Sequence, residues 1–136
     1  GTIAGTGGVT LLDGRETLTG NNSYTGETTI SGGTLALAGD GSIATSSGVT
    51  LSGGTFDISG TTDGASIASL SGNSGGAVAL GDETLTLTDA AGSFAGAMAG
   101  TGGVTLLDGR ETLTGNNSYT GETTISGGTL ALAGDG

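Results

Sequence analysis

Short apolar–polar–apolar triplets, separated by glycine-rich turns, form the main pattern along this chain. Residues 49–58, VTLSGGTFDI, show it most clearly, because the triplets V-T-L and F-D-I flank a Gly-Gly turn. Successive side chains of a strand point to opposite faces, so each triplet predicts a short strand with its apolar residues inward. The pattern fits residues 28–37 and 78–87 position by position, and residues 9–18 more loosely. The chain therefore predicts many short strands joined by tight turns.

A longer repeat contains these short ones. Residues 4–41 recur without a change as residues 99–136, a shift of 95 residues. Short units start at positions 9, 28, 49, 78, 104 and 123, so four of them fill the 95-residue repeat. A mean period of about 24 residues is typical of solenoid proteins. We expect one β-solenoid segment over residues 1–136, in which residues 42–98 form the coils between the identical copies.

Each short unit predicts one coil of a parallel β-solenoid with a roughly triangular cross-section. Ordering a residue costs about 1–2 kcal/mol, and one buried aliphatic side chain returns only about 1.5–3 kcal/mol, so a coil is unstable alone. Stacked coils pair their backbones at about 4.8 Å and cover one another's apolar faces. The residues expected to form the core and the stacking contacts are Val9, Leu11, Tyr24, Ile30, Leu35, Leu37, Val49, Leu51, Phe56, Ile58, Val78, Leu80, Leu85, Leu87, Val104, Leu106, Tyr119, Ile125, Leu130 and Leu132.

Composition narrows the classes of protein further. Gly contributes 32 of the 136 residues and interrupts every potential helix, so we expect essentially none. Thirteen acidic residues against two Arg and no Lys give a net charge of −11, which argues against binding to nucleic acid or to an anionic membrane. No Cys is present for disulfides, and no apolar run is long enough to span a bilayer. Because no signal peptide is visible, we expect a segment of a longer protein whose targeting parts lie elsewhere.

Few residues are candidates for catalysis, phosphate binding or metal binding. The glycine-rich residues 5–8 have neither a following Lys nor a helix start, so they read as a turn and not as a phosphate loop. Asp82 and Glu83 form the only adjacent acidic pair, and no His, Cys or Lys is present to activate a nucleophile. We expect no catalytic residue and no cofactor. The spacing of known calcium loops is absent, yet calcium binding stays open, with the candidate ligands Asp13, Glu16, Asp108 and Glu111.

Other residues allow a binding role. Tyr24 and Tyr119 either fill the core or a corner, or expose an aromatic ring to a glycan or a partner protein. Thr-x-Thr patterns in residues 84–88 resemble an ice-binding face, but successive coils do not keep them in register. The loops that vary between coils, residues 61–66 and 90–97, would form one corner of the solenoid. The candidate binding residues in these loops are Thr61, Thr62, Asp63 and Phe94.

Residues 18–35, LTGNNSYTGETTISGGTL, resemble the passenger-associated transport strand repeat of bacterial autotransporters and related surface adhesins. They fit the pattern L-T-x-x-N-x-Y-x-G-x-T-x-I-x-x-G-x-L, and residues 113–130 fit it again. The resemblance implies a right-handed parallel β-helix that is exported through the outer membrane, with a repeat that aids export and folding. The repeat has no catalytic residues in that family, so the resemblance implies none in this chain.

The sequence therefore predicts a structural and adhesive segment of an exported bacterial passenger, extracellular and at the outer-membrane surface. Its physical role would be that of a stiff rod or fibre. One alternative is a glycan- or receptor-binding module that uses the variable loops, and a distant alternative is a polysaccharide-degrading β-helix enzyme. Neighbouring repeats or other copies of the chain, joined end to end, are the expected partners. Glycans or a host surface are further candidates, whereas nucleic acid and membrane insertion are not expected.

Overall fold

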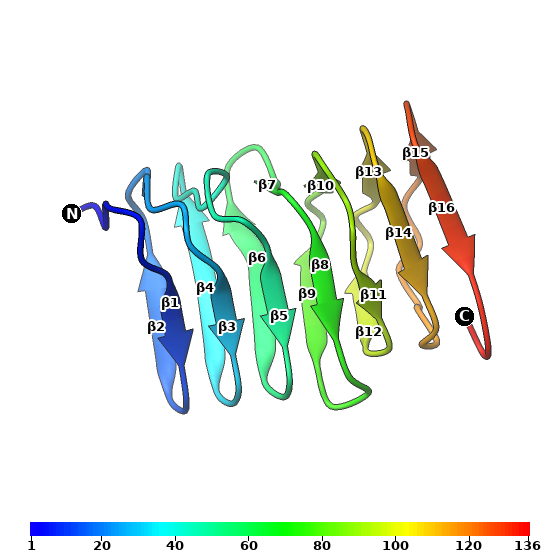
Figure 1. Ribbon diagram of the computed structural model, residues 1–136, viewed down its shortest axis with the longest axis horizontal. Coiled ribbons are helices and arrows are strands. Elements are labelled where there is room, and N and C mark those ends of the chain that lie inside the picture. The colour runs from blue at the N-terminus through cyan, green and yellow to red at the C-terminus, as the bar shows by residue number, and fades with distance from the viewer.

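The computed structural model describes residues 1–136 as an all-β, right-handed solenoid of about six turns (Figure 1). The chain descends along the front of the molecule, returns along the back, and advances toward its C-terminal end with every turn. Neighbouring strands pair in parallel throughout, as stacked coils require. The expected fold class is thus confirmed. No helix in the structure is long and apolar enough to cross a membrane.

The strands form three parallel sheets, which lie on the three sides of the coil. The seven-stranded sheet contains β1 (Val9–Leu11), β3 (Thr28–Ile30), β5 (Val49–Leu51), β8 (Leu70–Gly72), β11 (Ser93–Phe94), β14 (Arg110–Leu113) and β16 (Thr129–Leu132). The five-stranded sheet contains β2 (Arg15–Leu18), β4 (Thr34–Gly39), β6 (Thr55–Thr61), β9 (Ala77–Gly81) and β12 (Ala97–Gly100). The four-stranded sheet contains β7 (Ala65–Ile67), β10 (Leu85–Leu87), β13 (Val104–Leu106) and β15 (Thr123–Ile125).

One column of paired residues along the seven-stranded sheet measures the length of each coil. Its members follow one another at intervals of 19, 21, 21, 22, 19 and 19 residues. The coil is therefore shorter than the mean of about 24 residues that the sequence spacing indicated. The column consists of Leu11, Ile30, Leu51, Gly72, Phe94, Leu113 and Leu132.

Because the coil is shorter than expected, one pairing of residues between coils that the sequence pattern indicated is wrong. The sequence pattern equated Val78 with Val49, but Val49 pairs with Leu70 in the seven-stranded sheet, and Val78 pairs with Phe56 in the five-stranded sheet. The reason is physical: all three sides of the coil need the same alternation of inward apolar and outward polar residues. Alternation alone therefore cannot say on which side a strand lies.

The two identical copies of the repeat consequently occupy different sides of the solenoid. The V-T-L strand lies in the seven-stranded sheet in the first copy, as β1, and in the four-stranded sheet in the second copy, as β13. The R-E-T-L strand moves in the same sense, from the five-stranded sheet as β2 to the seven-stranded sheet as β14. One 95-residue repeat thus spans about four and two-thirds turns, where the sequence spacing indicated about four.

The core is a single column of apolar side chains inside the coil. Fourteen of the twenty residues expected in the core and stacking contacts are buried, and Val9, Leu11, Tyr119 and Leu130 are partly buried against the core. The other two belong to the last coil, which has a neighbour on one side only, and there Ile125 and Leu132 are 51% and 65% exposed. Further buried members are Leu18, Ile43, Ile67, Leu70, Ala90, Phe94, Met98 and Leu113.

Two of the candidate binding residues belong to the interior. Phe94 is fully buried in β11, with its ring beside the glycines at positions 76 and 96, so its assignment to a binding loop is wrong. Thr61 is also buried, at the end of β6, and its hydroxyl donates a hydrogen bond to the carbonyl of Ile58 at 2.8 Å. Thr62 and Asp63 remain exposed on the corner that follows β6.

Candidate functional site: the coil-to-coil contacts of the repeat

The repeated segment concentrates its polar and glycine residues at one corner of the coil, between β2 and β3 in the first copy. Asn22, Tyr24, Gly26 and Thr28 occupy this corner, and the same residues recur at positions 117, 119, 121 and 123. They follow an alternating pattern, and backbone hydrogen bonds such as Asn22 N–H to the Ser42 carbonyl and Gly26 N–H to the Gly7 carbonyl pair this corner with the coils on either side. Side chains add further hydrogen bonds between the coils at this corner.

Asn22 ties three consecutive coils together. Its side chain is 2% exposed, and its Oδ1 atom accepts a hydrogen bond from the backbone N–H of Ile3 at 2.8 Å. Its Nδ2 atom donates to the carbonyl of Gly20 at 3.0 Å and to the carbonyl of Ser42 in the next coil at 3.1 Å. In the second copy, Asn117 Oδ1 accepts from the N–H of Met98 at 2.8 Å in the same way. The sequence pattern includes Asn22 and Asn117, but the sequence alone does not indicate this inward role.

A buried chain of hydroxyl groups lies beside Asn22. The Tyr24 hydroxyl is 2.7 Å from Thr28 Oγ1, which in turn is 2.8 Å from the hydroxyl of Ser46 on the next coil. Ser46 donates to the carbonyl of Gly26 at 2.7 Å, so every hydroxyl in the chain has a partner. Burial raises the pKa of Tyr24, against the lowering effect of its bond to Thr28. Of the two roles left open for Tyr24, the structure shows the core role.

Gly26 is needed at this corner because the previous coil lies directly against its Cα atom. A Cβ atom there would lie 2.5 Å from the carbonyl carbon of Gly7 and 2.6 Å from the nitrogen of Gly8, far inside normal contact. Gly121 meets Gly102 and Gly103 in the same way. The spacing Tyr-x-Gly-x-Thr thus combines a hydroxyl pair four residues apart with a glycine that lets the coils touch.

An ion pair also bridges coils on the outer surface. Arg15 of β2 reaches over β4 to Asp57 of β6, with 3.3 Å between Nη2 and Oδ2. Burial opposes the charged form of Asp57, but hydrogen bonds from Ser59 and the Arg15 guanidinium together lower the pKa of its carboxyl. Arg15 is largely exposed, so the pair adds little stability.

Glu111 is the one carboxylate inside the core. It pairs with Leu130 in an inward column of the seven-stranded sheet, and both of its carboxyl oxygens are buried without a hydrogen-bond partner. Burial raises the pKa of Glu111 to about 7, against a lowering effect of the backbone at Gly92 and Leu70. A carboxyl in this setting is most stable when it is protonated.

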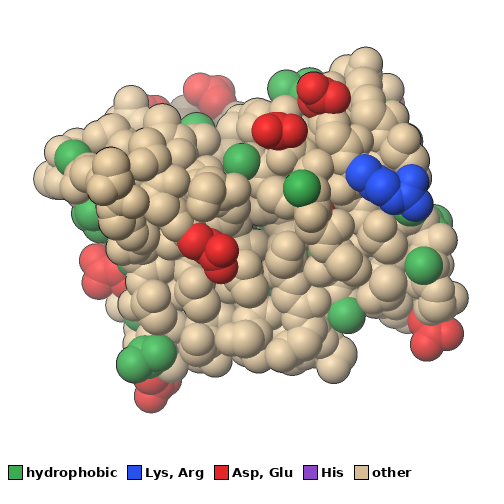
Figure 2. Space-filling view, in the orientation of Figure 1, with side chains coloured by type: hydrophobic (Ala, Val, Ile, Leu, Met, Phe, Trp, Pro, Cys, Tyr) green, Lys and Arg blue, Asp and Glu red, His purple; other side chains and the backbone are tan.

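The candidate calcium ligands lie apart from one another. Asp13 and Asp108 each accept the N–H of the glycine that follows, at 2.7 Å, which is a turn contact. Glu16 is exposed on the first coil, whereas Glu111 is inside the core. Nowhere does the structure bring three or more His, Cys, Asp or Glu side chains together in a way that could hold a metal ion. Acidic side chains are dispersed over the face in Figure 2.

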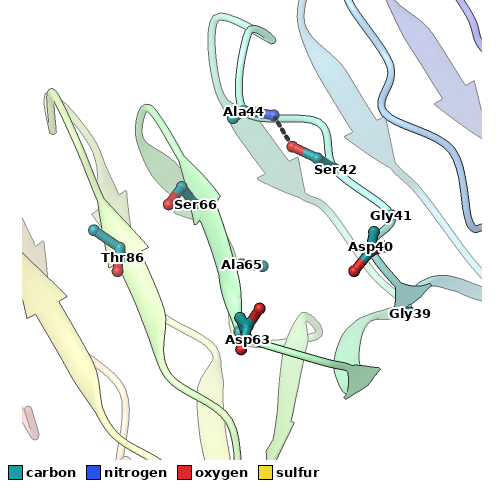
Figure 3. A pocket seen from close by; sticks show the side chains of 10 residues that line it. Gly39, Asp40, Gly41, Ser42, Ala44, Asp63, Ala65, Ser66 and Thr86 are labelled. Atoms are coloured by element: carbon teal, nitrogen blue, oxygen red, sulfur yellow. Dashed lines mark hydrogen bonds between the residues drawn. The ribbon is translucent and has the colours of Figure 1, made fainter.

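A shallow polar hollow of about 280 Å³ lies at the corner that sequence reasoning assigned to binding. It opens between the turn after β4, which carries Asp40 and Ser42, and strand β7, which follows Asp63 (Figure 3). Ser66 and Thr86 of the neighbouring strands β7 and β10 complete the lining. The Ser42 hydroxyl accepts the N–H of Ala44 at 3.2 Å. Two carboxylates and small side chains line the hollow, and no aromatic ring does.

These features define a class: a parallel β-solenoid whose coils are held together by a repeated corner of Asn, Tyr, Gly and Thr. The family model described as passenger-associated-transport-repeat matches residues 4–37 and 98–132, just over half of the chain. The chain therefore belongs to the passenger-associated-transport-repeat family. It is a structural segment of an autotransporter passenger, exported and associated with the cell surface, and its family is not known for enzymatic activity. No curated protein and no solved structure matched the chain.

Replacing Gly26 by Ala should destabilise the chain, because the new methyl group must push the coil at Gly7 away. We expect a loss of about 2–4 kcal/mol in the free energy of unfolding, measured by urea denaturation. Gly7→Ala is the matched control, since a Cβ atom at Gly7 meets nothing within 4 Å. Equal losses in both variants would contradict the close-contact role of Gly26.

Glu111 should make stability depend on pH. Its pKa is raised in the folded chain, so its contribution is fully present below about pH 4.5 and is lost as the pH rises through about 7. The loss amounts to about 3 kcal/mol, or roughly 10 °C in melting temperature between pH 5 and pH 8. The Glu111→Gln variant should melt at a higher temperature than the wild type at pH 8 and lack most of this slope.

Glu16→Gln is the control for Glu111→Gln, because Glu16 is the same residue of the repeat in an exposed position. It should leave the pH slope of the melting temperature as it is in the wild type. A Glu111→Gln variant with the wild-type slope would contradict the burial of an unpaired carboxyl in the core.

Proposed function

We propose that this chain is a stiff spacer in the passenger of a bacterial surface protein, displayed outside the outer membrane, where it holds adhesive or other functional parts away from the cell. The proposal rests mainly on how the two identical copies are placed and paired in the solenoid. They lie on different sides of the coil, yet each keeps the same internal pairing, with Val9 on Thr28 in one copy and Val104 on Thr123 in the other. A repeat with this property can be added without disturbing its neighbours.

Extension follows directly from the geometry of the coil. Each turn adds about 4.8 Å to the axis, so six turns give a rod of about 29 Å and one 95-residue repeat adds about 22 Å. Every coil is tied to the next by backbone pairs on its sheets, and the corners at Asn22 and Asn117 add side-chain hydrogen bonds between coils. Such a ladder resists bending because bending breaks hydrogen bonds on one side. The dispersed acidic groups of the outer surface favour separation of neighbouring rods.

The same stacking suits export. A chain that crosses a membrane in an extended form can fold coil by coil on the far side, because each coil needs only the previous coil as its template. Contacts between coils 19–22 residues apart keep the sequence separation short. This supports a role of the repeat in folding after transport.

The binding-module alternative rests on the hollow beside Asp63. Its open shape and hydroxyl groups could contact a glycan, but its two carboxylates and its small side chains offer no stacking platform. The spacer role draws on contacts throughout the chain, so it is the function that the structure supports best.

A chain with one additional 95-residue unit, residues 42–136 repeated once more, tests the spacer role. Small-angle X-ray scattering at low protein concentration should show a maximum dimension longer by about 22 Å at an unchanged cross-sectional radius. The original chain is the control. A larger cross-section, or a length that does not grow, would contradict the proposed rod.

A further inference from the structure

Two segments of the chain carry the sequence pattern Asn-x-Ser, one in each copy of the repeat. Residues 21–23 read NNS, and residues 116–118 read NNS again. An asparagine followed two residues later by a hydroxyl residue is the acceptor pattern for a sugar on the side-chain amide, when the middle residue is not Pro. The position of the two side chains in the fold decides whether a sugar has access to the amide.

The backbone alternates at the first of these segments, so that Asn21 and Ser23 lie on the outer face together. Both residues are exposed, whereas Asn22 and Tyr24 are buried. The repeat uses the two buried residues for its contacts between coils, and its pattern L-T-x-x-N-x-Y leaves positions 21 and 23 open. The amide and the hydroxyl of the acceptor pattern therefore lie on one surface, outside the contacts that hold the coils together.

Coils on both sides hold the backbone of this segment. Asn21 forms a parallel bridge with Ser42 of the next coil. The N–H of Ser23 donates a hydrogen bond to the carbonyl of Ile3 in the preceding coil at 2.9 Å. The side chain of Asn21 is thus exposed within the stack, with one coil before it and one after it.

The second copy repeats this placement on another side of the solenoid. Asn116 and Ser118 are exposed, and the N–H of Ser118 donates to the carbonyl of Met98 in the preceding coil at 2.9 Å. The first segment lies between β2 of the five-stranded sheet and β3 of the seven-stranded sheet, and the second lies between β14 of the seven-stranded sheet and β15 of the four-stranded sheet. At about 4.8 Å per turn, the two segments are about 22 Å apart along the axis.

The other three asparagines of the chain have their amides in hydrogen bonds. The Nδ2 atoms of Asn22 and Asn117 donate to backbone carbonyls of their own corner. Asn73 is exposed, but its Nδ2 atom donates to the carbonyl of Ser52 at 2.9 Å and its Oδ1 atom accepts the N–H of Gly75 at 2.9 Å. The residue two positions after Asn73 is this glycine, which has no hydroxyl. Asn73 is therefore an internal control for the two Asn-x-Ser segments.

We propose that Asn21 and Asn116 are sites of N-linked glycosylation, with a sugar activated as a phosphate ester as the donor and a glycosyltransferase of the same bacterium as the partner. The Nδ2 atom attacks the anomeric carbon of the sugar, so that an N–C bond forms while the C–O bond to the phosphate breaks. The phosphate group leaves with the electron pair of that bond, and one amide proton passes to a base of the transferase. No atom is oxidised or reduced.

A glycan at each site adds to the spacer role without changing the rod. Bulky, hydrated sugars on different sides of the solenoid thicken it and separate it from neighbouring rods, as the acidic groups do. The modification does not depend on the spacer role, because the corner alone presents the acceptor. The scattering experiment on the lengthened chain and the glycosylation experiment therefore fail independently of each other.

Glycosylation is tested with the purified 136-residue chain, folded by circular dichroism, in two reactions. One contains a soluble asparagine glycosyltransferase with a nucleotide-activated hexose, and the other contains a membrane-bound oligosaccharyltransferase with a lipid-linked oligosaccharide. Peptide mapping by mass spectrometry should find sugar on Asn21 and Asn116 in at least one reaction and none on Asn73. Addition of a single hexose or of the whole oligosaccharide identifies the donor that the sites accept.

Variants of the first copy make the test specific, because the second copy in the same molecule is the matched control. Ser23→Ala should abolish the sugar on Asn21 and leave the sugar on Asn116 unchanged, whereas Ser23→Thr should retain both. Circular dichroism verifies that both variants are folded. A chain without sugar in either reaction, an equal level of sugar on Asn73, or a Ser23→Ala variant that keeps the sugar on Asn21 would overturn the proposal.

Discussion

Parallel backbone pairing between consecutive coils is the interaction on which the rest of this structure depends. A coil of 19–22 residues has too few apolar side chains to fold alone, and its strands are only two to seven residues long. Stacking gives each strand a ladder on both sides and places inward residues such as Ile30, Leu51 and Phe94 in one column. Glycine supports this arrangement where backbones touch, as at Gly26.

The sequence predicted the solenoid well, because apolar alternation and the 95-residue repeat both follow from the stacking of coils. It could not predict on which side a strand lies. The triplets at Val49 and Val78 look alike, yet they lie in different sheets. The reason is that every side of the coil requires the same alternation of inward apolar and outward polar residues. Because the three sides are nearly equivalent, an identical 38-residue segment can start on one side of the coil in the first copy and on another side in the second. Phe94 illustrates the same limit, because a loop and a short buried strand share its local pattern.

Polar residues inside the coil were the least predictable part. Asn22 looks like a turn residue, and its hydrogen bonds to Ile3 and Ser42 appear only when coils 19–20 residues away are placed beside it. Glu111 shares its sequence context with Glu16, and its buried position follows from its place in the stack and not from its neighbours in sequence. Both cases show that a residue in a solenoid is defined by the coils above and below it.

The register of the coils is the central claim, and paired cysteines measure it directly in a chain that has no native Cys. Thr50 lies beside Ser71 in adjacent strands β5 and β8, at the separation of about 4.8 Å that a disulfide accommodates. The alignment of Val49 with Val78 would place Thr50 beside Ala79 instead. The double variant Thr50→Cys and Ser71→Cys should therefore oxidise readily to a disulfide, while Thr50→Cys and Ala79→Cys should stay reduced, and the reverse result would contradict the account.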